Sequence, residues 1–139
     1  MSETRIEGTL DTAWWWEALR SEELLVPTCR TCDKRFFPPQ PFCNNCGSKD
    51  WYGAQSGGMG KIYSWVVIHR PFAPEYADKV PYAIVAVDLD EGCRLIGRYL
   101  GDLDLIRDGL PVHFRAFREA GEALLGFEAV AQTQDAQAA

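Results

Sequence analysis

The order of apolar and polar residues along the chain predicts a short helix near the N-terminus and a series of strands after it. Residues 12–22 contain good helix formers, with Asp11 and Thr12 as candidate N-caps, and predict the helix. Five later runs are short, rich in β-branched and aromatic residues, and separated by Gly, Pro and Asp, which is the pattern of strands. These runs are residues 61–70, 81–89, 93–100, 111–117 and 123–130.

A helical link is predicted between the third and fourth of these runs. Leu103, Ile106 and Leu110 recur there at helical spacing, and Gly109 with Pro111 supplies the stop signal. Strands in this number, with a helical link after the third, match the OB-fold, which is a small Greek-key barrel. We therefore expect the C-terminal part of the chain to form a five-stranded OB-fold barrel.

Small and polar residues mark the boundaries between the expected parts of the chain. Residues 53–60, GAQSGGMG, are too small and flexible to pack, and they predict a hinge between two modules. The final residues contain no large apolar side chain and are expected to be disordered. The predicted division is an N-terminal helix region at 1–24, a ribbon at 25–57, an OB-fold domain at 58–130 and a disordered tail at 131–139.

The cysteines predict a metal site, because four of the five form two Cys-x-x-Cys pairs. Zinc prefers four tetrahedral ligands, and each pair directs two thiolates at one metal, so the pairs complete a closed structural site. Gly47 after the second pair permits the left-handed turn of such a site, and Asp33 after the first tolerates it. Iron in a rubredoxin-like site and a reduced cluster without metal remain alternatives. The predicted ligands are Cys29, Cys32, Cys43 and Cys46.

With this site the expected fold class is mainly β: an N-terminal helix, a four-cysteine zinc ribbon of rubredoxin-like type and the C-terminal barrel.

The charge argues against a nucleic acid partner, because a formal net charge of −6 and a pI near 4.9 give no excess of basic residues for phosphate backbones. No basic N-terminal region precedes an apolar stretch, and no run of about 18 apolar residues occurs, so we expect a cytoplasmic protein without a membrane partner. An odd cysteine count in that compartment fits metal ligation better than disulfides.

Aromatic side chains gather in three segments and indicate contact with another protein. Three consecutive tryptophans in the predicted helix fan over about 200°, because successive helix residues are rotated by about 100°. Either one indole stays partly exposed on its own domain or it lies in a subunit contact, and we favour the contact. Two phenylalanines between the cysteine pairs either seal the ribbon against the barrel or add to the surface that contacts another protein. The predicted interface residues are Trp14, Trp15, Trp16, Phe36, Phe37, Phe72 and Tyr76.

No self-sufficient active site is recognisable in the sequence. His69 and His113 each lie in a predicted strand, where a histidine is more often packed and hydrogen-bonded than catalytic. Cys93 has no histidine near it in the sequence and is interpreted as a small half-buried thiol. No Gly-x-Ser-x-Gly motif or phosphate-binding loop occurs. We therefore expect no catalysis by the chain alone, and a stand-alone enzyme using Cys93 is the weakest alternative.

A four-cysteine ribbon after a tryptophan-bearing helix, followed by VPYAIVAVDLDEG and IRDGLPVHF, resembles a known family. The chain is similar to the zinc-ribbon plus OB-fold proteins, long described as a domain of unknown function, that accompany thiolase-superfamily enzymes. The resemblance covers about residues 12–130. Where family members often have arginine after the paired prolines, this chain has Gln40. Besides the cysteines, the residues that carry the resemblance are Pro81, Tyr82, Leu89, Glu91, Gly92, Gly109 and Val112.

The resemblance implies a function and a ligand. Members of this family bind acyl-CoA or lie beside a partner's acyl-CoA site, and they pair with thiolases, hydroxymethylglutaryl-CoA synthases or thiolase-like aldolases of steroid side-chain degradation. It implies that this chain is a non-catalytic accessory subunit of a hetero-oligomer with a thiolase-superfamily subunit, with structural zinc as cofactor and a coenzyme A thioester as ligand. The cations nearest the predicted junction of ribbon and barrel, which we expect to contact CoA, are Lys34, Arg35, Arg70, Arg94 and Arg98.

The alternative function is nucleic acid binding. An OB-fold face that shows Tyr63, Trp65 and His69 can stack bases. A CoA thioester needs only a few cations for its phosphates, whereas a nucleic acid strand needs an extended basic groove. The acidic composition therefore favours the CoA-associated function.

Overall fold

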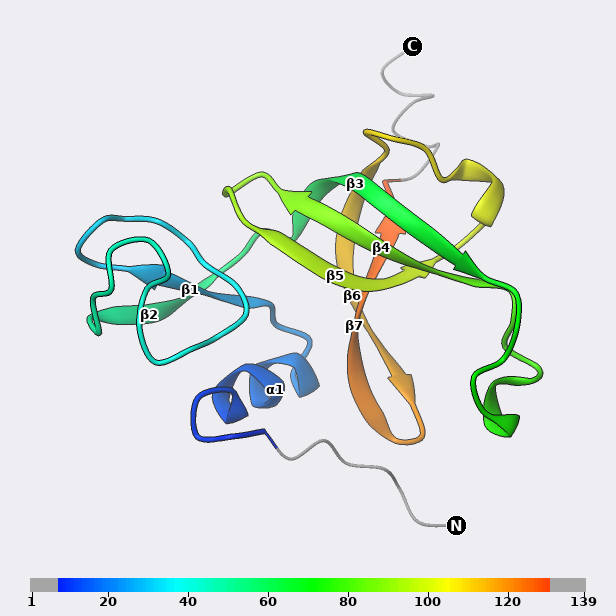
Figure 1. Ribbon diagram of the computed structural model, residues 1–139, viewed down its shortest axis with the longest axis horizontal. Helices are drawn as coiled ribbons and strands as arrows, with labels where there is room; N and C mark the ends of the chain where they lie inside the picture. The colour runs from blue at the N-terminus through cyan, green and yellow to red at the C-terminus, as the bar shows by residue number, and fades with distance from the viewer. Residues whose placement is uncertain (1–7, 131–139) are drawn as a thin grey trace.

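The structure is a computed structural model of the chain, and it describes residues 8–130. Figure 1 shows a small two-stranded ribbon on one side, a barrel on the other, and a short helix, α1 (Ala13–Arg20), near the junction of the two. The predicted disordered tail at 131–139 lies outside the described residues. Within the described part of the chain, no helix is long and apolar enough to cross a membrane.

A closed barrel of five strands confirms the predicted OB-fold. The strands are β3 (Met59–Ile68), β4 (Tyr82–Leu89), β5 (Arg94–Leu100), β6 (Pro111–Glu119) and β7 (Glu122–Ala129). Their order is β3-β4-β5-β7-β6, and β6 pairs back with β3 through Met59, Gly60 and Lys61 of β3. Neighbouring strands are antiparallel except β5 and β7, which are parallel. The predicted helical link is one 3-10 turn, η2 (Leu103–Leu105).

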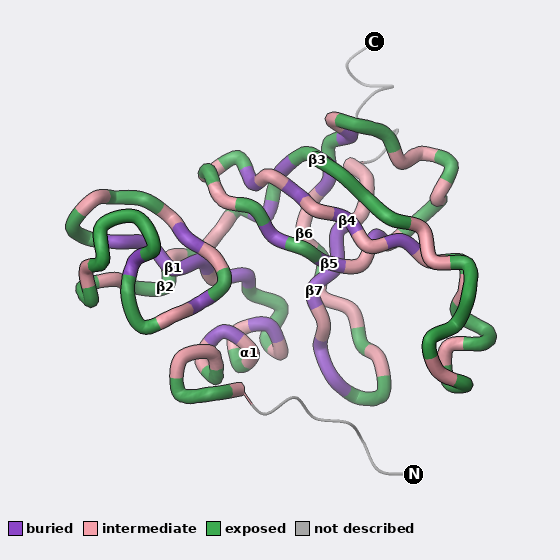
Figure 2. The backbone as a smooth tube through the Cα atoms, viewed as in Figure 1, coloured by how far each residue is buried: buried purple, intermediate pink, exposed green. Residues whose placement is uncertain are grey.

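Strand alternation fills the inside of the barrel. In β4 every second residue from Ala83 to Leu89 is buried, because successive side chains of a strand point to opposite faces. Phe127 of β7 is fully buried in the same cluster, and Leu19 of α1 joins it from outside the sheet. Figure 2 shows these buried segments in purple along β4, β7 and part of α1. One apolar core therefore includes both the barrel and the helix.

The three tryptophans of α1 all pack within this chain, against different surfaces. The Trp14 ring lies 5.6 Å from the ring of Trp51 in the ribbon. Trp15 is only 5% exposed and belongs to the core cluster of the barrel, and the Trp16 ring meets it edge-on at 4.9 Å. The prediction that Trp15 faces a partner is therefore wrong, because the wide fan of indoles lets one short helix contact ribbon and barrel at once.

The predicted hinge at 53–60 is wrong for most of its length. Gly53 lies within β2 (Trp51–Gln55), which pairs antiparallel with β1 (Leu25–Cys29), and residues 59 and 60 already belong to β3. A Cβ on Gly53 would lie 2.6 Å from Cζ3 of Trp14. Glycine is needed there because the helix packs closely against the strand, and not because the chain bends.

Only residues 56–58 connect the ribbon to the barrel, and Glu91 in the turn between β4 and β5 holds them. The Ser56 hydroxyl donates to Glu91 Oε1 at 2.8 Å, and the Gly57 N–H donates to Glu91 Oε2 at 3.0 Å. The Ser56 N–H donates to the carbonyl oxygen of Leu24 at 2.9 Å. The connector is therefore hydrogen-bonded to both parts that it joins.

Candidate metal centre and the adjacent cavity

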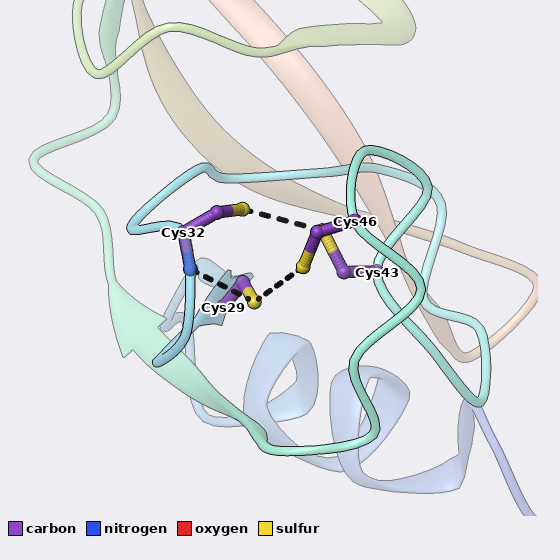
Figure 3. A group of neighbouring side chains, drawn as sticks. All are labelled: Cys29, Cys32, Cys43 and Cys46. Atoms are coloured by element: carbon purple, nitrogen blue, oxygen red, sulfur yellow. Dashed lines mark hydrogen bonds between the residues drawn. The ribbon is translucent and has the colours of Figure 1, made fainter.

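The four predicted ligands converge on one point of the ribbon (Figure 3). Their Sγ atoms all lie within 4.8 Å of one another, with 3.5 Å between Cys29 and Cys46 and 3.7 Å between Cys32 and Cys43. In a tetrahedral zinc site with bonds of about 2.3 Å, the sulfur atoms lie about 3.8 Å apart. The cysteines therefore fit a structural zinc ion, as the sequence predicted.

Both Cys-x-x-Cys turns supply backbone N–H groups to the sulfur atoms. The Thr31 N–H donates to Cys29 Sγ at 3.3 Å, and the Asn45 N–H donates to Cys43 Sγ at 3.3 Å. Hydrogen bonding from the Cys32 N–H, together with that from Thr31, lowers the pKa of Cys29 to about 6. Zinc binds the thiolate, so these donors prepare the sulfur for the metal.

Two residues with left-handed backbone end these turns. Asp33 has φ 64° and Gly47 has φ 78°. Glycine adopts this conformation without steric cost, and aspartate is among the few other residues that tolerate it. The structure thus confirms the turn residues that the sequence indicated.

A small apolar cluster supports the metal site. Phe36 is 1% exposed and packs with Cys29 and Cys43, and its ring lies 5.9 Å from the ring of Trp51. The prediction that Phe36 faces a partner is therefore wrong, because so thin a ribbon uses its own phenylalanine as a core. The neighbouring Phe37 lies 5.5 Å from Trp15, ring to ring, and seals the ribbon against the main core, which is the other reading that the sequence allowed.

A cavity of about 420 Å³, here called the junction cavity, lies between α1, the loop after Phe36 and the outer face of the barrel. Phe37, Pro38 and Pro39 line it from the ribbon, and Trp15 and Trp16 line it from the helix. The barrel contributes Ile84, Ile96, Gly97, Arg98, Phe117, Leu124 and Leu125. Almost every side chain in this wall is apolar.

Two of the predicted CoA-contacting cations are engaged within the barrel. Arg98 Nη2 donates to Glu119 Oε2 at 3.1 Å, and its guanidinium lies 4.5 Å from the centre of the Tyr82 ring. Arg94 donates to both carboxylate oxygens of Asp88, at 2.6 and 3.1 Å. Hydrogen bonding from Arg94 lowers the pKa of Asp88, so this pair stays ionised at neutral pH.

The other three cations lie at separate places. Arg35 acts electrostatically on Cys93 in the β4–β5 turn, and its Nη1 is buried with no hydrogen-bond partner among the described residues. Lys34 beside it is exposed. Arg70 lies just after β3, next to the start of β4. The β4–β5 turn lies at the opposite end of β4, about 25 Å away along the strand. The five residues therefore do not form one phosphate site.

The groups weighed as catalytic do not assemble into a nucleophile and base. Burial, with a contribution from Glu91, raises the pKa of Cys93 to about 11, which keeps its thiol protonated at neutral pH. His113 Nε2 lies 3.1 Å from Glu128 Oε1 instead. Across residues 8–130, neither histidine is hydrogen-bonded to Cys93.

The loop between β3 and β4 displays the most exposed of the predicted interface residues. Phe72 is 80% exposed. Tyr76, at the end of η1 (Pro74–Tyr76), instead packs 6.1 Å from the Tyr82 ring and lies under the Lys79 ammonium. Lys79 pairs with Glu119 at 3.2 Å. The loop is therefore braced on its Tyr76 side while Phe72 projects into solvent.

The junction cavity and the role of Glu91 were not predicted from the sequence. The cavity walls come from α1, the proline loop and four strands, so no local period marks them. The paired prolines before Gln40 were the one local signal, since they hold the loop extended. In the sequence, Glu91 is marked by the resemblance and by its place in a turn, and its bonds to Ser56 and Gly57 depend on the folded arrangement.

Family models match the chain over two ranges that follow these two parts. The model described as ChsH2, rubredoxin-like zinc ribbon domain, matches residues 16–51. The model described as ChsH2, C-terminal OB-fold domain, matches residues 54–118. Ribbon and barrel are thus matched separately, in the order in which the structure shows them.

Two relatives and one solved structure are similar over most of this chain. A probable enoyl-CoA hydratase alpha subunit of Thermomonospora curvata is 39% identical over 73% of this chain but only 32% of that protein, so this chain spans about a third of its length. A DUF35 domain-containing scaffold protein of Methanothermobacter thermautotrophicus is 36% identical over 78% of this chain and 84% of that protein. A chain of a structure described as Ltp2-ChsH2(DUF35) aldolase has a TM-score of 0.81 and 32% identity, covering 91% of this chain and 100% of that one. This chain therefore belongs to the DUF35 family, in which a zinc ribbon precedes an OB-fold.

Proposed function

We propose that this chain is a non-catalytic accessory subunit of a hetero-oligomeric complex acting on acyl-CoA, and that its partner is a thiolase-superfamily enzyme. The observation that carries the proposal is the match of nearly the whole chain to one chain of the Ltp2-ChsH2(DUF35) aldolase structure. The names of the two relatives, a hydratase alpha subunit and a scaffold protein, support a place in a complex. The partner supplies the nucleophile and base, and this chain stabilises the assembly.

The geometry supports a scaffolding role. A zinc ion held by four cysteines has no open coordination position, so it stabilises the ribbon and does not react. Trp14 contacts the ribbon while Trp15 packs against the barrel, and Glu91 holds the connector. We expect ribbon and barrel to move as one body when a partner docks.

Lys34 and Arg35 are the cations that best fit the phosphates of coenzyme A. Among the residues that the structure describes, neither side chain forms an ion pair with a carboxylate, so both charges are available to a phosphate. Arg94 and Arg98 already bind the carboxylates of Asp88 and Glu119. We infer that the nucleotide end of the thioester contacts the ribbon side of the junction.

Replacing Phe72 with alanine should weaken the complex with a thiolase-superfamily subunit about tenfold or more without changing the stability of this chain. A projecting aromatic side chain is a typical anchor of an interface, and its removal when buried against a partner costs about 2 kcal/mol or more. The measurement is size exclusion with light scattering of co-expressed subunits, followed by a titration. Phe42→Ala, which truncates a half-exposed phenylalanine of the ribbon outside the predicted interface, is the matched control.

Two results would contradict the proposal. One is a chain that never associates with any thiolase-superfamily subunit. The other is an isolated chain that turns over an acyl-CoA thioester unaided. Equal affinities for wild type and Phe72→Ala would remove Phe72 from the interface but leave the assembly itself supported.

Replacing Arg35 with alanine should weaken CoA binding by the assembled complex about tenfold. Hydrogen bonds between a guanidinium and a phosphate are charge-assisted and contribute about 1.5 to 3 kcal/mol. Isothermal titration with CoA measures the loss, and Arg107→Ala, which removes an exposed arginine beyond η2, is the control. Unchanged affinity would exclude Arg35 from the CoA site. Salt-sensitive binding of a single-stranded oligonucleotide would instead favour the nucleic acid alternative.

A further inference from the structure

A charged contact joins the end of α1 to the barrel. Arg20, the last residue of the helix, donates from Nε to Glu122 Oε1 and from Nη2 to Glu122 Oε2, both at 3.1 Å. The Arg20 side chain is 20% exposed and that of Glu122 is only 4% exposed. Arg118 also donates from Nη2 to the carbonyl oxygen of Arg20 at 2.8 Å. The helix end is therefore bonded to both strands of the β6–β7 hairpin.

The hairpin holds the Glu122 carboxylate in a fixed place. The turn has two residues, Ala120 with φ 52° and Gly121 with φ 83°, and Glu122 follows them directly. Two-residue turns with positive φ match the twist of the flanking strands and fix their register, which here pairs Glu119 with Glu122. The Ala123 N–H donates to Glu122 Oε1 at 2.9 Å. The carboxylate that binds Arg20 is thus oriented by the backbone of the barrel.

A buried pair with this geometry contributes more to orientation than to stability. The cost of removing both charges from water offsets much of their attraction, and apolar residues of similar size often replace such pairs without loss of stability. A guanidinium and a carboxylate joined by two parallel hydrogen bonds nevertheless approach each other in one plane and one direction. The packing of Trp15 and Phe37 on the main core is apolar and has no such direction. The pair supplies the direction that those contacts lack.

The pair also lies far from the covalent connection between ribbon and barrel. Met59 and Gly60, which follow the connector, pair with His113 and Val112 at the start of β6. The β6–β7 turn follows the other end of β6, roughly 20 Å along the strand. Figure 1 shows the β6–β7 turn next to α1, whereas the connector joins the barrel near the far end of β6. At that distance a contact resists rotation about the connector effectively, because it acts on a long lever arm.

We propose that the Arg20–Glu122 pair is an orienting clasp that fixes the angle of α1 and the ribbon on the barrel, and that its two members are positioning residues. The connector at 56–58, which the β4–β5 turn holds, is the hinge about which the ribbon would turn without the clasp. The angle matters to the proposed function, because the expected partner contact in the β3–β4 loop and the expected phosphate contacts in the ribbon lie on different sides of the hinge. The proposal rests on the proposed function only for that consequence, since the clasp is a property of the isolated chain.

The test uses the full chain with its zinc and the residual dipolar couplings of backbone amides, which report the orientation of each part. Arg20→Lys keeps the charge but cannot form two parallel bonds to one carboxylate. A second variant, Arg20→Met with Glu122→Leu, replaces the pair by apolar side chains. Arg115→Lys is the matched control, because it makes the same substitution in an exposed pair, with Glu128 at 2.7 Å, that lies within the barrel.

In wild type and Arg115→Lys we expect one alignment tensor to fit the couplings of both ribbon and barrel. In Arg20→Lys and in the double variant, the ribbon couplings should no longer fit the tensor of the barrel, although each part keeps its folded amide spectrum. A common tensor in Arg20→Lys overturns the proposal, because a pair that only adds stability would leave the orientation unchanged. Should the double variant fail to fold, the result for Arg20→Lys alone decides.

The same variants test the consequence for assembly. If about a tenth of the molecules keep the angle that the partner requires, the affinity for the thiolase-type subunit falls about tenfold. Unchanged affinity in variants that have lost the common tensor would overturn this consequence. Failure of the wild-type chain to bind any such subunit would contradict the proposed function, whereas the couplings of the isolated chain would still decide the clasp.

Discussion

Replacing Cys43 with serine is expected to release the zinc and unfold the ribbon while the barrel remains folded. The Cys43 side chain is 1% exposed, and its sulfur lies 3.7 Å from that of Cys32, so a serine there removes one of four converging ligands. Structural zinc contributes about 10 to 16 kcal/mol of apparent binding free energy in peptides of this kind. The ribbon has only two short strands and the Phe36 cluster to offset that loss.

Elemental analysis of reduced, tag-free protein measures the release of zinc. Amide NMR spectra measure the unfolding, because they resolve the signals of the ribbon from those of the barrel. Wild type should hold one zinc per chain, and the variant should lose both the metal and the dispersed ribbon signals. Cys93→Ser is the control, because Cys93 lies outside the quartet and should leave the metal content unchanged. Wild-type protein without metal would contradict the assignment, and iron in place of zinc would correct the identity of the ion.

Replacing Trp15 with alanine should lower the free energy of unfolding of the isolated chain by about 3 to 5 kcal/mol. Truncating a buried tryptophan removes apolar contacts and leaves a cavity, and changes of this kind carry that cost. Trp15 touches both Trp16 and Phe37, so its loss also loosens the packing of the helix and the ribbon against the barrel. The expected result is a destabilised subunit, and not merely a weaker contact with a partner.

Urea denaturation of the isolated chain, followed by far-ultraviolet circular dichroism, measures this change. Phe72→Ala is the control, since a side chain that is 80% exposed should change stability by about 0.5 kcal/mol or less. A Trp15→Ala variant as stable as wild type would show that its indole contributes little to the core. The pair of variants thus separates a residue that stabilises this chain from one expected to bind a partner.

Local patterns were sufficient to predict most of the fold. The five strands were recognised from short runs of β-branched and aromatic residues, and each begins and ends within a few residues of its predicted range. The metal ligands followed from the Cys-x-x-Cys spacing, and the turn residues Asp33 and Gly47 followed from their need for positive φ. These signals are reliable because each arises from residues that are neighbours in the chain.

Residues whose contacts lie far away in the sequence were misread. Gly53 was interpreted as part of a hinge, yet its small size is required by the Trp14 ring of α1. The number of aromatic residues in their segments predicts Trp15 and Phe36 to be interface residues, but both are buried within this chain. The sequence predicts Arg94 and Arg98 to be available to a ligand, but in the structure they bind the carboxylates of Asp88 and Glu119.

The sequence by itself determined the zinc ligands, the strands of the barrel and the family resemblance, because these depend on spacing and residue type along the chain. Only the tertiary structure decided which aromatic rings are free, which cations are already paired, and where a ligand can enter. The junction cavity exists because α1, the proline loop and the outer face of the barrel meet in space. No local period encodes that meeting, since it arises when one helix packs Trp15 against the outside of the barrel and Trp14 against the ribbon.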